Sequence, residues 1–594
     1  MTLLKNFILV ATLAFSMAVS SVYAGTLTVD LSAPIKPVDH AASGSLYGIA
    51  DVNWPPERWI EAVQPKNFTQ MAPGGQHLPN GETAPVGDAL KVAPIAARYG
   101  ASVTIRMPDI FPSFPYVWKG DEFWADEIDR VVTETVAANL DNIYGYEIWN
   151  EPDWNWNAEW GDFNQLWATT YTRIRAIDAD RAIMGPSATK WDRDWIRAFL
   201  VSAVETASVP EIISWHELDP MSVSDIEVHV AEYRALEKEL GLSARPISIN
   251  EYGSPRTMAD PGALTHYIAQ LERAGVDTAN LAFWHRPGRL SDLLAPVEGG
   301  RGPAINVEPT GAFWLYDWYG EMSGNMVAAS AVGGEKSPFD GFAAFDSTKR
   351  IASIVVGGEA GDHSIVVSGL EQLGDVVDIK AQATHWTGTD GGLAAPTDLF
   401  SGRFAVVEGV ISVPVQLQRG SDAINLVITP GTGVAPSSGV DILMVPQNFS
   451  ARFEAEDGER VRMRKFVNRL SPRKFFANKF SGESFVGFLN RSEASLTFTI
   501  TVPQAGTYDL SFGYSNGLDS VGKYGLSING VSQGMVEFTP TQARELIDQV
   551  HVRAELPEGE SRIVLTSGPV VEEFLIVPSV LELDYLDVSA VSDN

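Results

Sequence analysis

Short apolar runs alternate with amphipathic stretches over residues 46–319, and this alternation constrains the fold more than any other feature of the chain. The amphipathic stretches carry apolar residues three and four positions apart, as at Trp124, Ile128 and Val131, which is typical of helices with one buried face. Eight apolar runs have the length of β-strands: 46–50, 68–72, 103–107, 144–149, 182–186, 212–216, 247–251 and 281–285. Strands that alternate with helices form parallel sheets, and eight such units predict a closed (β/α)8 barrel, the TIM barrel.

The rest of the chain is predicted to form two β-rich modules. Residues 323–429 lack the helical period and carry short β-type runs separated by turn residues, which is typical of a β-sandwich. Segment 25–40 alternates like a strand and is expected to join this sandwich, so the barrel occupies residues 41–322. Glycine, proline and serine are frequent in 430–448, which predicts a linker. Residues 449–594 again show β-type runs and predict a C-terminal β-sandwich of the jelly-roll type.

The first 24 residues have the composition of a secretory signal peptide. Lys5 precedes the apolar run 7–19, and Val22-Tyr23-Ala24 offers the small residues that signal peptidases require. We therefore expect cleavage near Ala24 and secretion to the extracellular space or the periplasm. The apolar run is too short to span a bilayer, and no later run reaches that length, so a membrane is not an expected partner.

Composition excludes several classes of chemistry. The chain contains no cysteine, so disulfides, zinc–thiolate sites and cysteine nucleophiles are impossible. The formal net charge of −32 disfavours nucleic acid as a partner, because both polymers repel each other. The charge is typical of acid spread over a soluble surface, and it leaves the oligomeric state open.

Two glutamates lie at the ends of predicted strands. Glu151 follows the run Tyr146-Glu147-Ile148-Trp149-Asn150, and Glu251 ends the run Ile247-Ser248-Ile249-Asn250. In a TIM barrel the working residues lie at the C-terminal ends of strands, and these two belong to the fourth and seventh. Glycoside hydrolysis needs such a pair, since one carboxyl donates and recovers a proton while the other attacks or stabilises an oxocarbenium-like centre. The alternative is that each caps a helix or forms a surface ion pair.

These motifs carry a resemblance to a known group of enzymes. Ile148-Trp149-Asn150-Glu151-Pro152, followed by Ile249-Asn250-Glu251-Tyr252, resembles the retaining glycoside hydrolases of clan A, whose two glutamates occupy strands four and seven of a TIM barrel. A barrel followed by a β-sandwich is most similar to family 39, which includes β-xylosidases and α-L-iduronidases. The resemblance implies that Glu151 is the general acid/base, that Glu251 is the nucleophile, and that Asn150 binds the sugar 2-hydroxyl. This chemistry uses no cofactor.

Further residues near the predicted strand ends are expected to bind the substrate. His216 ends the sixth strand, where related enzymes place a histidine or tyrosine near the nucleophile, and a structural histidine is the alternative. Arg106 and Asp109, at the end of the third strand, either help to hold the carboxylates or the substrate or form structural ion pairs. Aromatic faces suit the apolar side of a sugar ring. On that ground, and from their places after strands four and eight, we expect substrate contacts from Trp154, Trp156, Trp284 and His285.

The C-terminal module has its own resemblance. Phe453-Glu454-Ala455-Glu456-Asp457 at its start and Leu583-Asp584-Tyr585-Leu586-Asp587 at its end resemble carbohydrate-binding modules of families 6 and 35. In those modules the opening acids and the terminal aspartate hold a structural Ca²⁺, a hard ion that takes oxygen ligands. The resemblance implies that Glu454, Glu456 and Asp584 are calcium ligands.

Together these features predict a secreted, multidomain retaining glycoside hydrolase that cleaves O-glycosyl bonds in a polysaccharide or oligosaccharide. One alternative is a clan A hydrolase of another family that acts on algal galactans, of the agarase or porphyranase type. Another is a non-catalytic glycan-binding protein on a barrel scaffold. The sugar, the linkage and exo or endo action depend on loop shapes that no motif here specifies.

Overall fold

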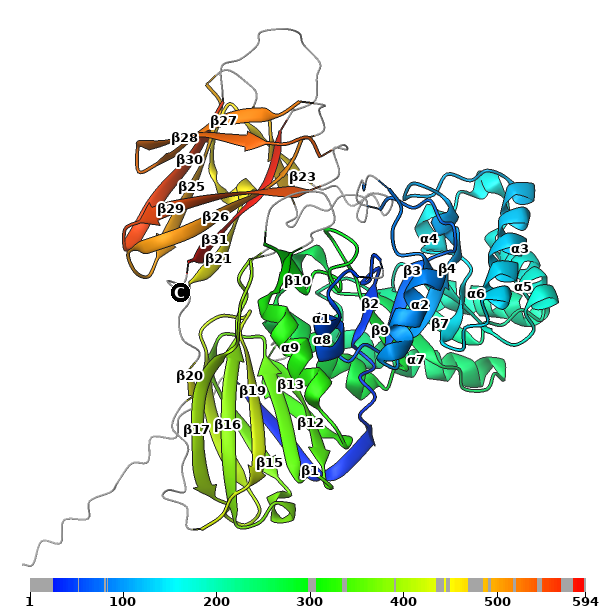
Figure 1. The fold of residues 1–594 in the computed structure, drawn as a ribbon, viewed down its shortest axis with the longest axis horizontal. Coiled ribbons are helices and arrows are strands. Elements are labelled where there is room, and N and C mark those ends of the chain that lie inside the picture. Colours follow the sequence, from blue (N-terminus) through cyan, green and yellow to red (C-terminus); the bar gives the residue numbers. More distant parts are fainter. Residues whose placement is uncertain are drawn as a thin grey trace, which may run out of the picture.

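The computed structural model describes residues 25–51, 53–79, 82, 84–297, 306–333, 339–388, 391–433, 443–444, 449–467, 484–489, 493–516, 520–541, 547–567 and 581–591. They form three modules, with the barrel on the right of Figure 1 and the two β-rich modules on the left. In these described ranges, no helix has both the length and the apolar character needed to cross a membrane. The signal peptide and most of the linker lie outside them.

The barrel closes from eight parallel strands, so the predicted fold class is confirmed. In barrel order the strands are β2 (Gly44–Leu46), β3 (Asn67–Met71), β4 (Ser102–Arg106), β5 (Ile143–Glu147), β6 (Ala182–Ala188), β7 (Ile212–Glu217), β8 (Ile247–Tyr252) and β9 (Thr278–Leu281). The main helices around it are α2 (Ala89–Arg98), α3 (Asp121–Ala138), α5 (Phe163–Ile177), α6 (Arg193–Glu205), α7 (Ile226–Leu240) and α8 (Pro261–Ala274). Helix α3 buries Trp124, Ile128 and Val131, the stripe that its sequence spacing indicated.

Three barrel strands end two or more residues earlier than predicted. The first barrel strand ends at Leu46 instead of beginning there, because Tyr47 has a left-handed backbone with φ of 46°. The last strand also ends where we expected it to begin, at Leu281. The apolar residue Phe283 beyond it packs edge-on against Tyr47, with ring centres 5.2 Å apart, so its apolar character comes from loop packing. Strand β5 ends at Glu147, four residues before Glu151.

The accessory module is one ten-stranded sheet. Its order is β17 (Thr397–Ala405), β16 (Val376–Thr384), β19 (Ala423–Pro430), β14 (Ile351–Gly357), β13 (Asp340–Asp346), β12 (Asn325–Gly333), β1 (Gly25–Pro37), β15 (Gly361–Ser368), β18 (Ile411–Leu417) and β20 (Leu443–Met444). The N-terminal strand β1 lies antiparallel to β12 and parallel to β15. Ile379 of β16 and Val413 of β18, from opposite halves of the order, share one buried core, so the sheet folds over as a sandwich.

The C-terminal module is a sandwich of two sheets around one apolar core. One sheet contains β21 (Ser450–Glu454), β23 (Arg464–Val467), β24 (Ser484–Gly487), β26 (Gly506–Ser515), β29 (Asp548–Leu556) and β31 (Glu582–Ala590). The other contains β22 (Glu459–Val461), β25 (Ser495–Val502), β27 (Gly522–Ile528), β28 (Val531–Phe538) and β30 (Gly559–Thr566). Asn529 and Gly530 join β27 to β28 with positive φ values of 50° and 81°, which a tight hairpin turn requires.

A partly buried arginine and a tryptophan link the three modules. Arg452 of β21 donates to both carboxylate oxygens of Asp587, at 2.7 and 2.8 Å, and lies 3.6 Å from the ring centre of Tyr585. Its guanidinium also lies 5.4 Å from the ring centre of Trp386, in the accessory module. The Trp386 indole donates to the carbonyl of Met258, in the loop that follows β8, at 3.2 Å. These contacts connect the C-terminal module to the barrel loop after the seventh strand.

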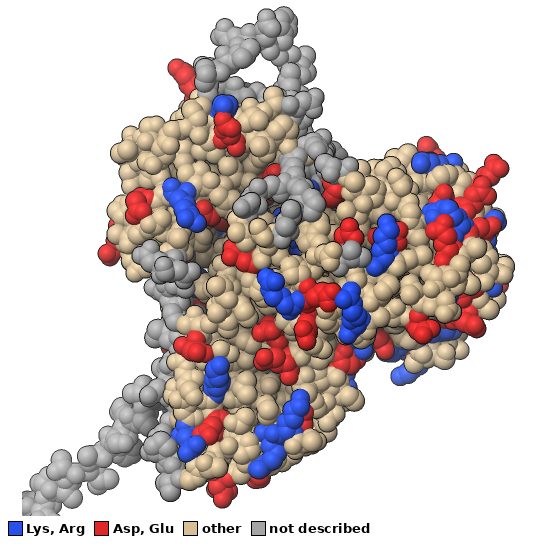
Figure 2. Space-filling model, viewed as in Figure 1, with Lys and Arg blue, Asp and Glu red and all other residues tan. Residues whose placement is uncertain are grey.

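The acidic side chains do not gather in one patch on the face drawn in Figure 2. Aspartate and glutamate are distributed over the modules, with lysine and arginine among them. On this face the acidic side chains therefore define no single binding site.

Candidate active site

Glu151 lies at the turn between β5 and the one-turn helix α4 (Pro152–Asn155). Its backbone is left-handed, with φ of 56°, which is uncommon for a residue other than glycine. The Glu151 N–H donates to the carbonyl of Ser187, at the end of β6, at 2.8 Å. Backbone conformations of this kind persist where the surroundings fix them and concentrate at functional sites. The side chain is 2% exposed.

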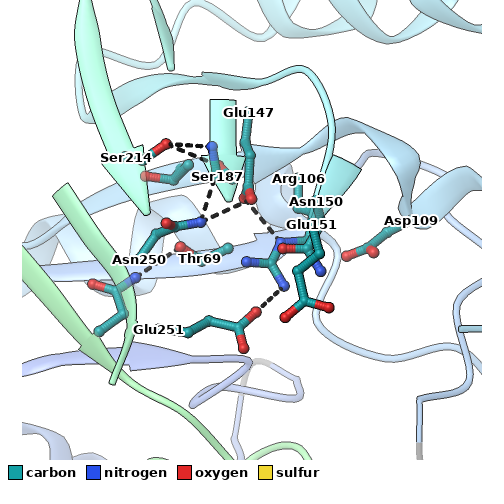
Figure 3. A network of polar contacts seen from close by, with 12 residues as sticks. Thr69, Arg106, Asp109, Glu147, Asn150, Glu151, Ser187, Ser214, Asn250 and Glu251 are labelled. Atoms are coloured by element: carbon teal, nitrogen blue, oxygen red, sulfur yellow. Dashed lines mark hydrogen bonds and ion pairs between the residues drawn. The ribbon is translucent and has the colours of Figure 1, made fainter. Parts of the chain in front are cut away.

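Glu251 lies near the C-terminal end of β8 and is held by an arginine. Arg106, at the end of β4, donates from Nη1 to Glu251 Oε1 at 2.7 Å and from Nε to Glu147 Oε2 at 2.8 Å (Figure 3). Glu147, the last residue of β5, also accepts from Asn250 Nδ2 at 2.8 Å. The guanidinium thus holds one oxygen of Glu251 in place. Glu251 itself is 8% exposed.

His216, near the end of β7, lies between the two glutamates. Its Nδ1 is 3.0 Å from Glu151 Oε1 and 3.8 Å from Glu251 Oε2. One oxygen of each glutamate and one ring nitrogen of His216 lie within 4.8 Å of one another. The structure therefore brings together Glu151, Glu251 and His216, which the sequence places at the ends of three different strands. The same three groups have a geometry that would also hold a metal ion, but two carboxyls and an imidazole at the catalytic face of a barrel suit proton transfer.

Burial and charge shift the pKa values of this cluster in the direction that acid–base chemistry needs. Burial raises the pKa of Glu151, and the charge of Glu251 adds to the effect, while hydrogen bonds from His216 and Trp154 oppose it. Burial lowers the pKa of His216, but the charges of Glu251 and Glu151 more than offset it, so the pKa is raised. Burial likewise opposes the charge of Arg106, and Glu147, Tyr47 and Glu251 outweigh it, so its pKa is raised. A raised pKa keeps Glu151 available as a proton donor.

Asn150 and Asn250 precede the two glutamates and line the floor beside them. Asn250 donates to Glu147 and, at 3.2 Å, to the hydroxyl of Ser187. Asn150 is 4% exposed, and its Oδ1 has no hydrogen-bond partner among the described residues. A buried acceptor of this kind is normally satisfied by a ligand or water. The contact of Asn150 with a sugar hydroxyl stays a prediction.

The four aromatic candidates lie in two loops. Trp154 of α4 donates its indole N–H to Glu151 Oε2 at 2.5 Å. Trp156 donates to the carbonyl of Gly161 at 2.9 Å and packs edge-on against Trp118, Trp149 and Trp160. Trp284 and His285 lie in the loop after β9, because that strand ends at Leu281. The backbone N–H of Trp284 donates to Asp292 Oδ2 at 2.6 Å, and Nδ1 of His285 lies 3.9 Å from Oδ1 of the same carboxylate. Their contact with substrate stays a prediction.

Two buried acids complete the site: Glu147, which sequence reasoning missed, and Asp109, which it placed at the end of the third strand beside Arg106. Glu147 is fully buried between Arg106 and Asn250, and a charged residue inside an apolar strand was the available signal. Asp109 follows β4 and accepts from the hydroxyls of Tyr47 at 2.6 Å and Tyr116 at 3.2 Å. Burial raises the pKa of Asp109 to about 7, against the opposing charge of Arg106.

The calcium candidates lie in the C-terminal module near the β21–β31 pair. Glu454 of β21 is the register partner of Tyr585 in β31, and Tyr585 directly follows Asp584 in the chain. Glu456 follows in a short turn, and its Oε2 is buried with no hydrogen-bond partner among the described residues. Burial raises the pKa of Glu456. The three side chains do not form a three-ligand group within 4.8 Å in the described ranges, so calcium binding stays a prediction.

Comparison with known proteins finds glycosidases among the relatives of this chain. No family model matches the chain. The 3-O-alpha-D-galactosyl-alpha-L-arabinofuranosidase of Bifidobacterium longum subsp. longum is 26% identical over 559 residues, which cover 82% of this chain and 47% of the relative. The 3-O-beta-L-arabinopyranosyl-alpha-L-arabinofuranosidase of Bifidobacterium pseudocatenulatum is 27% identical over 444 residues, which cover 62% and 44%. The chain spans less than half the length of these curated relatives.

A solved structure gives a closer match over a shorter length. The structure of N2152 from Neocallimastix frontalis is 32% identical in sequence, with a TM-score of 0.63. The match covers 69% of this chain and all of that one. Two thirds of the chain therefore have a counterpart of similar fold and clearly related sequence.

Proposed function

Because the chain belongs to the clan A glycoside hydrolases, we propose that it cleaves a glycosidic bond with retention of configuration, with Glu151 as acid/base and Glu251 as nucleophile. One observation carries the proposal: oxygens of the two carboxyls lie within 4.8 Å of each other at the C-terminal ends of the barrel strands. Retaining enzymes hold their carboxyls about 5–5.5 Å apart, whereas inverting enzymes need about 6.5–9.5 Å to admit a water molecule.

The first step forms a covalent intermediate. Glu251 attacks the anomeric carbon while protonated Glu151 gives its proton to the glycosidic oxygen, and the bond between that carbon and that oxygen breaks. Arg106 donates to Oε1 of Glu251, which leaves Oε2, on the His216 side, to make the new bond. The leaving sugar departs as an alcohol, and the glycosyl group remains esterified to Glu251.

The second step returns the enzyme to its starting state. Ionised Glu151 takes a proton from a water molecule, whose oxygen attacks the anomeric carbon and displaces Glu251 as a carboxylate. Two displacements at one carbon restore the original configuration. The sequence of steps draws on two carboxyls and water, so it requires no cofactor.

For the substrate we propose an α-L-arabinofuranoside whose arabinofuranose carries a second sugar at O3. The names of both curated relatives describe such a substrate, and they differ only in the sugar attached at O3. Cleavage of this substrate would release a disaccharide, which distinguishes the proposed activity from release of free arabinose. Asn150 supports recognition of a sugar hydroxyl, because its buried Oδ1 lacks a partner within the described part of the chain.

We further propose roles for the other segments. The C-terminal sandwich binds glycan and holds the barrel near its substrate, which raises the local concentration without changing the chemistry. Glu456 supports a calcium site there, because its buried oxygen lacks a partner in the described ranges and Glu454 lies close by. The leader before Ala24 supports secretion. Calcium content of the purified protein, before and after chelation, and N-terminal sequencing of the secreted form test these two points.

The variant Glu251→Ala tests the mechanism. Its turnover should fall by roughly a thousandfold or more, because no nucleophile remains, with the fold intact by circular dichroism. Added azide should partly restore turnover and give a glycosyl azide of inverted configuration, since azide then replaces the carboxylate in a single displacement. Glu239→Ala removes a surface glutamate that pairs with Arg197 at 2.7 Å and serves as the control. Full activity of Glu251→Ala would remove the proposal.

A further inference from the structure

The indole of Trp154 contacts the proposed acid/base directly. Its Nε1 lies 2.5 Å from Oε2 of Glu151, while the other oxygen, Oε1, lies 3.0 Å from His216. Both oxygens of the carboxyl therefore have a nitrogen partner. A short hydrogen bond from an N–H favours a carboxylate over a carboxylic acid and fixes the plane of the group.

We propose that Trp154 is a positioning residue for the acid/base: its indole N–H orients the Glu151 carboxyl and favours the ionised form that accepts a proton from water in the second step. The inference rests on the proposed function. It gives Trp154 a role different from the sugar platform that its sequence position indicated.

The turn that carries Trp154 is held by contacts that do not involve its indole N–H. Asp153 accepts from the backbone N–H of Thr189 at 2.9 Å and from its hydroxyl. Asn155 donates to the carbonyl of Asn150 at 2.9 Å and accepts from Trp149 Nε1 at 2.9 Å. Helix α4 is therefore anchored on both sides of Trp154. Removing the indole N–H should change the carboxyl without releasing the turn.

The ring of Trp154 is also held from outside the turn. Phe114 packs edge-on against it, with ring centres 5.6 Å apart and planes 79° apart, and Tyr116 packs against Phe114 in the same way at 5.3 Å. A phenylalanine at position 154 would keep an aromatic ring in this contact, but it would lose the N–H and one of the two fused rings. The variant Trp154→Phe therefore needs a control that makes the same change of volume elsewhere.

The electrostatics give the sign of the effect. Burial raises the pKa of Glu151, and the bond from Trp154 is among the contacts that lower it. Loss of that bond removes a donor to the ionised form, so the pKa of Glu151 should rise further. In kcat/KM profiles the upper pH limb reports the group that must be protonated in the free enzyme. That limb should move to higher pH in Trp154→Phe.

The kinetic test compares two α-L-arabinofuranosides, one with a dinitrophenyl leaving group and one with a sugar leaving group. Dinitrophenolate leaves without a proton, so Trp154→Phe should keep kcat/KM for the aryl substrate within about twofold of the wild type. For the saccharide, kcat/KM should fall by roughly tenfold to a hundredfold, because the mispositioned acid limits the step. Trp191→Phe is the matched control, since it makes the same change of volume and the Trp191 indole donates at 2.7 Å to Glu232 of helix α7, not to either catalytic glutamate. Its pH profile and both kcat/KM values should match the wild type.

A second measurement needs no substrate. In ¹⁵N-tryptophan NMR spectra the Trp154 indole signal, assigned by its absence from Trp154→Phe, should shift as Glu151 titrates. The shift should vanish in Glu151→Gln, whose side chain has no proton to lose.

The results separate two failures. The role of Trp154 would be overturned if kcat/KM fell equally on both substrates and the upper pH limb did not move. It would also be overturned if the pH-dependent shift of the indole signal persisted in Glu151→Gln. A wild-type protein that hydrolyses no glycan would instead overturn the proposed function, and the NMR titration would still decide whether the indole responds to Glu151.

Discussion

The variant Glu147→Gln should weaken both the barrel and the nucleophile. Glu147 is fully buried and accepts one hydrogen bond from Arg106 and one from Asn250, each at 2.8 Å. Glutamine has the same shape but only one acceptor oxygen. Its amide oxygen can meet one of these two donors, and its NH₂ group then faces the other. The change therefore removes a negative charge beside a buried guanidinium and leaves one buried donor without an acceptor.

The size of the effect follows from these contacts. A hydrogen bond between charged groups contributes about 1.5–3 kcal/mol, and a buried donor left without an acceptor costs about 1–3 kcal/mol. Breaking a buried ion pair costs about 3–5 kcal/mol when the remaining charge has no other partner. Arg106 keeps its ion pair with Glu251 at 2.7 Å, so the cost lies at the lower end of the range for a broken buried ion pair. We expect Glu147→Gln to lower the free energy of unfolding by about 3 kcal/mol.

The same substitution should also lower kcat, through its effect on Arg106. With Glu147 neutral, the guanidinium is balanced by Glu251 alone and is free to shift toward it, which draws the nucleophile away from its attacking position. Small displacements of a reacting group cost up to about a hundredfold in rate. We expect kcat to fall roughly tenfold or more, with KM changed less.

Urea unfolding followed by tryptophan fluorescence measures the stability. The segment 449–594 contains no tryptophan, so the signal reports on the barrel and the accessory module. Glu239→Gln, which neutralises a surface glutamate paired with Arg193 and Arg197, is the control and should leave the midpoint unchanged. A loss below about 1 kcal/mol with kcat intact would refute the reasoning, and it would mean that Glu147 is already protonated beside Arg106.

Two further predictions concern pH and the contact between modules. Because burial raises the pKa of Asp109 to about 7, its contribution to stability is complete below about pH 4 and is lost as the pH rises through 7. Asp109→Asn should therefore gain stability relative to the wild type between those values, measured by urea unfolding at several pH values, and a constant difference would contradict this. Arg452→Ala removes the contacts with Asp587 and Trp386, so protease cleavage in segment 430–448 should become several times faster, while Arg562→Ala, whose arginine pairs with Glu459, should match the wild type. Equal cleavage rates would show that Arg452 does not hold the module.

The barrel could be predicted from the sequence because its signals are local. The stripe of α3 and the apolar strand runs each lie within about twenty residues, and eight repeats of one unit leave few topologies. Glu151 and Glu251 were visible for the same reason, since each follows an apolar run. The strand ends at Leu46 and Leu281 could not be predicted. They depend on the backbone turn at Tyr47 and on the packing of Phe283 against the Tyr47 ring, a contact between the two ends of the barrel sequence.

The side-chain network around the glutamates was only partly accessible to sequence reasoning. Arg106 and Glu147 are register partners on neighbouring strands, so a barrel with β4 beside β5 already predicts their ion pair. The bond from Trp154 to Glu151 could not be read in this way. It depends on the left-handed backbone at Glu151, which turns α4 back over the carboxyl, and nothing in the run Trp149-Asn150-Glu151-Pro152 indicates that conformation.

The charges of the site connect these contacts to the mechanism. Glu147, Glu151 and Glu251 surround Arg106 and His216, and all five side chains are buried or nearly so. With Glu151 protonated and His216 neutral, the cluster has one net negative charge. With the proton moved to His216, the net charge is the same but two more buried groups are ionised, and the attraction between them across 3.0 Å offsets the cost of burying both charges. The proton therefore belongs to the pair, and its titration is a property of both groups. A glycosidic oxygen that lies between the two glutamates accepts this proton from Glu151. His216, 3.0 Å away, then stabilises the carboxylate that remains.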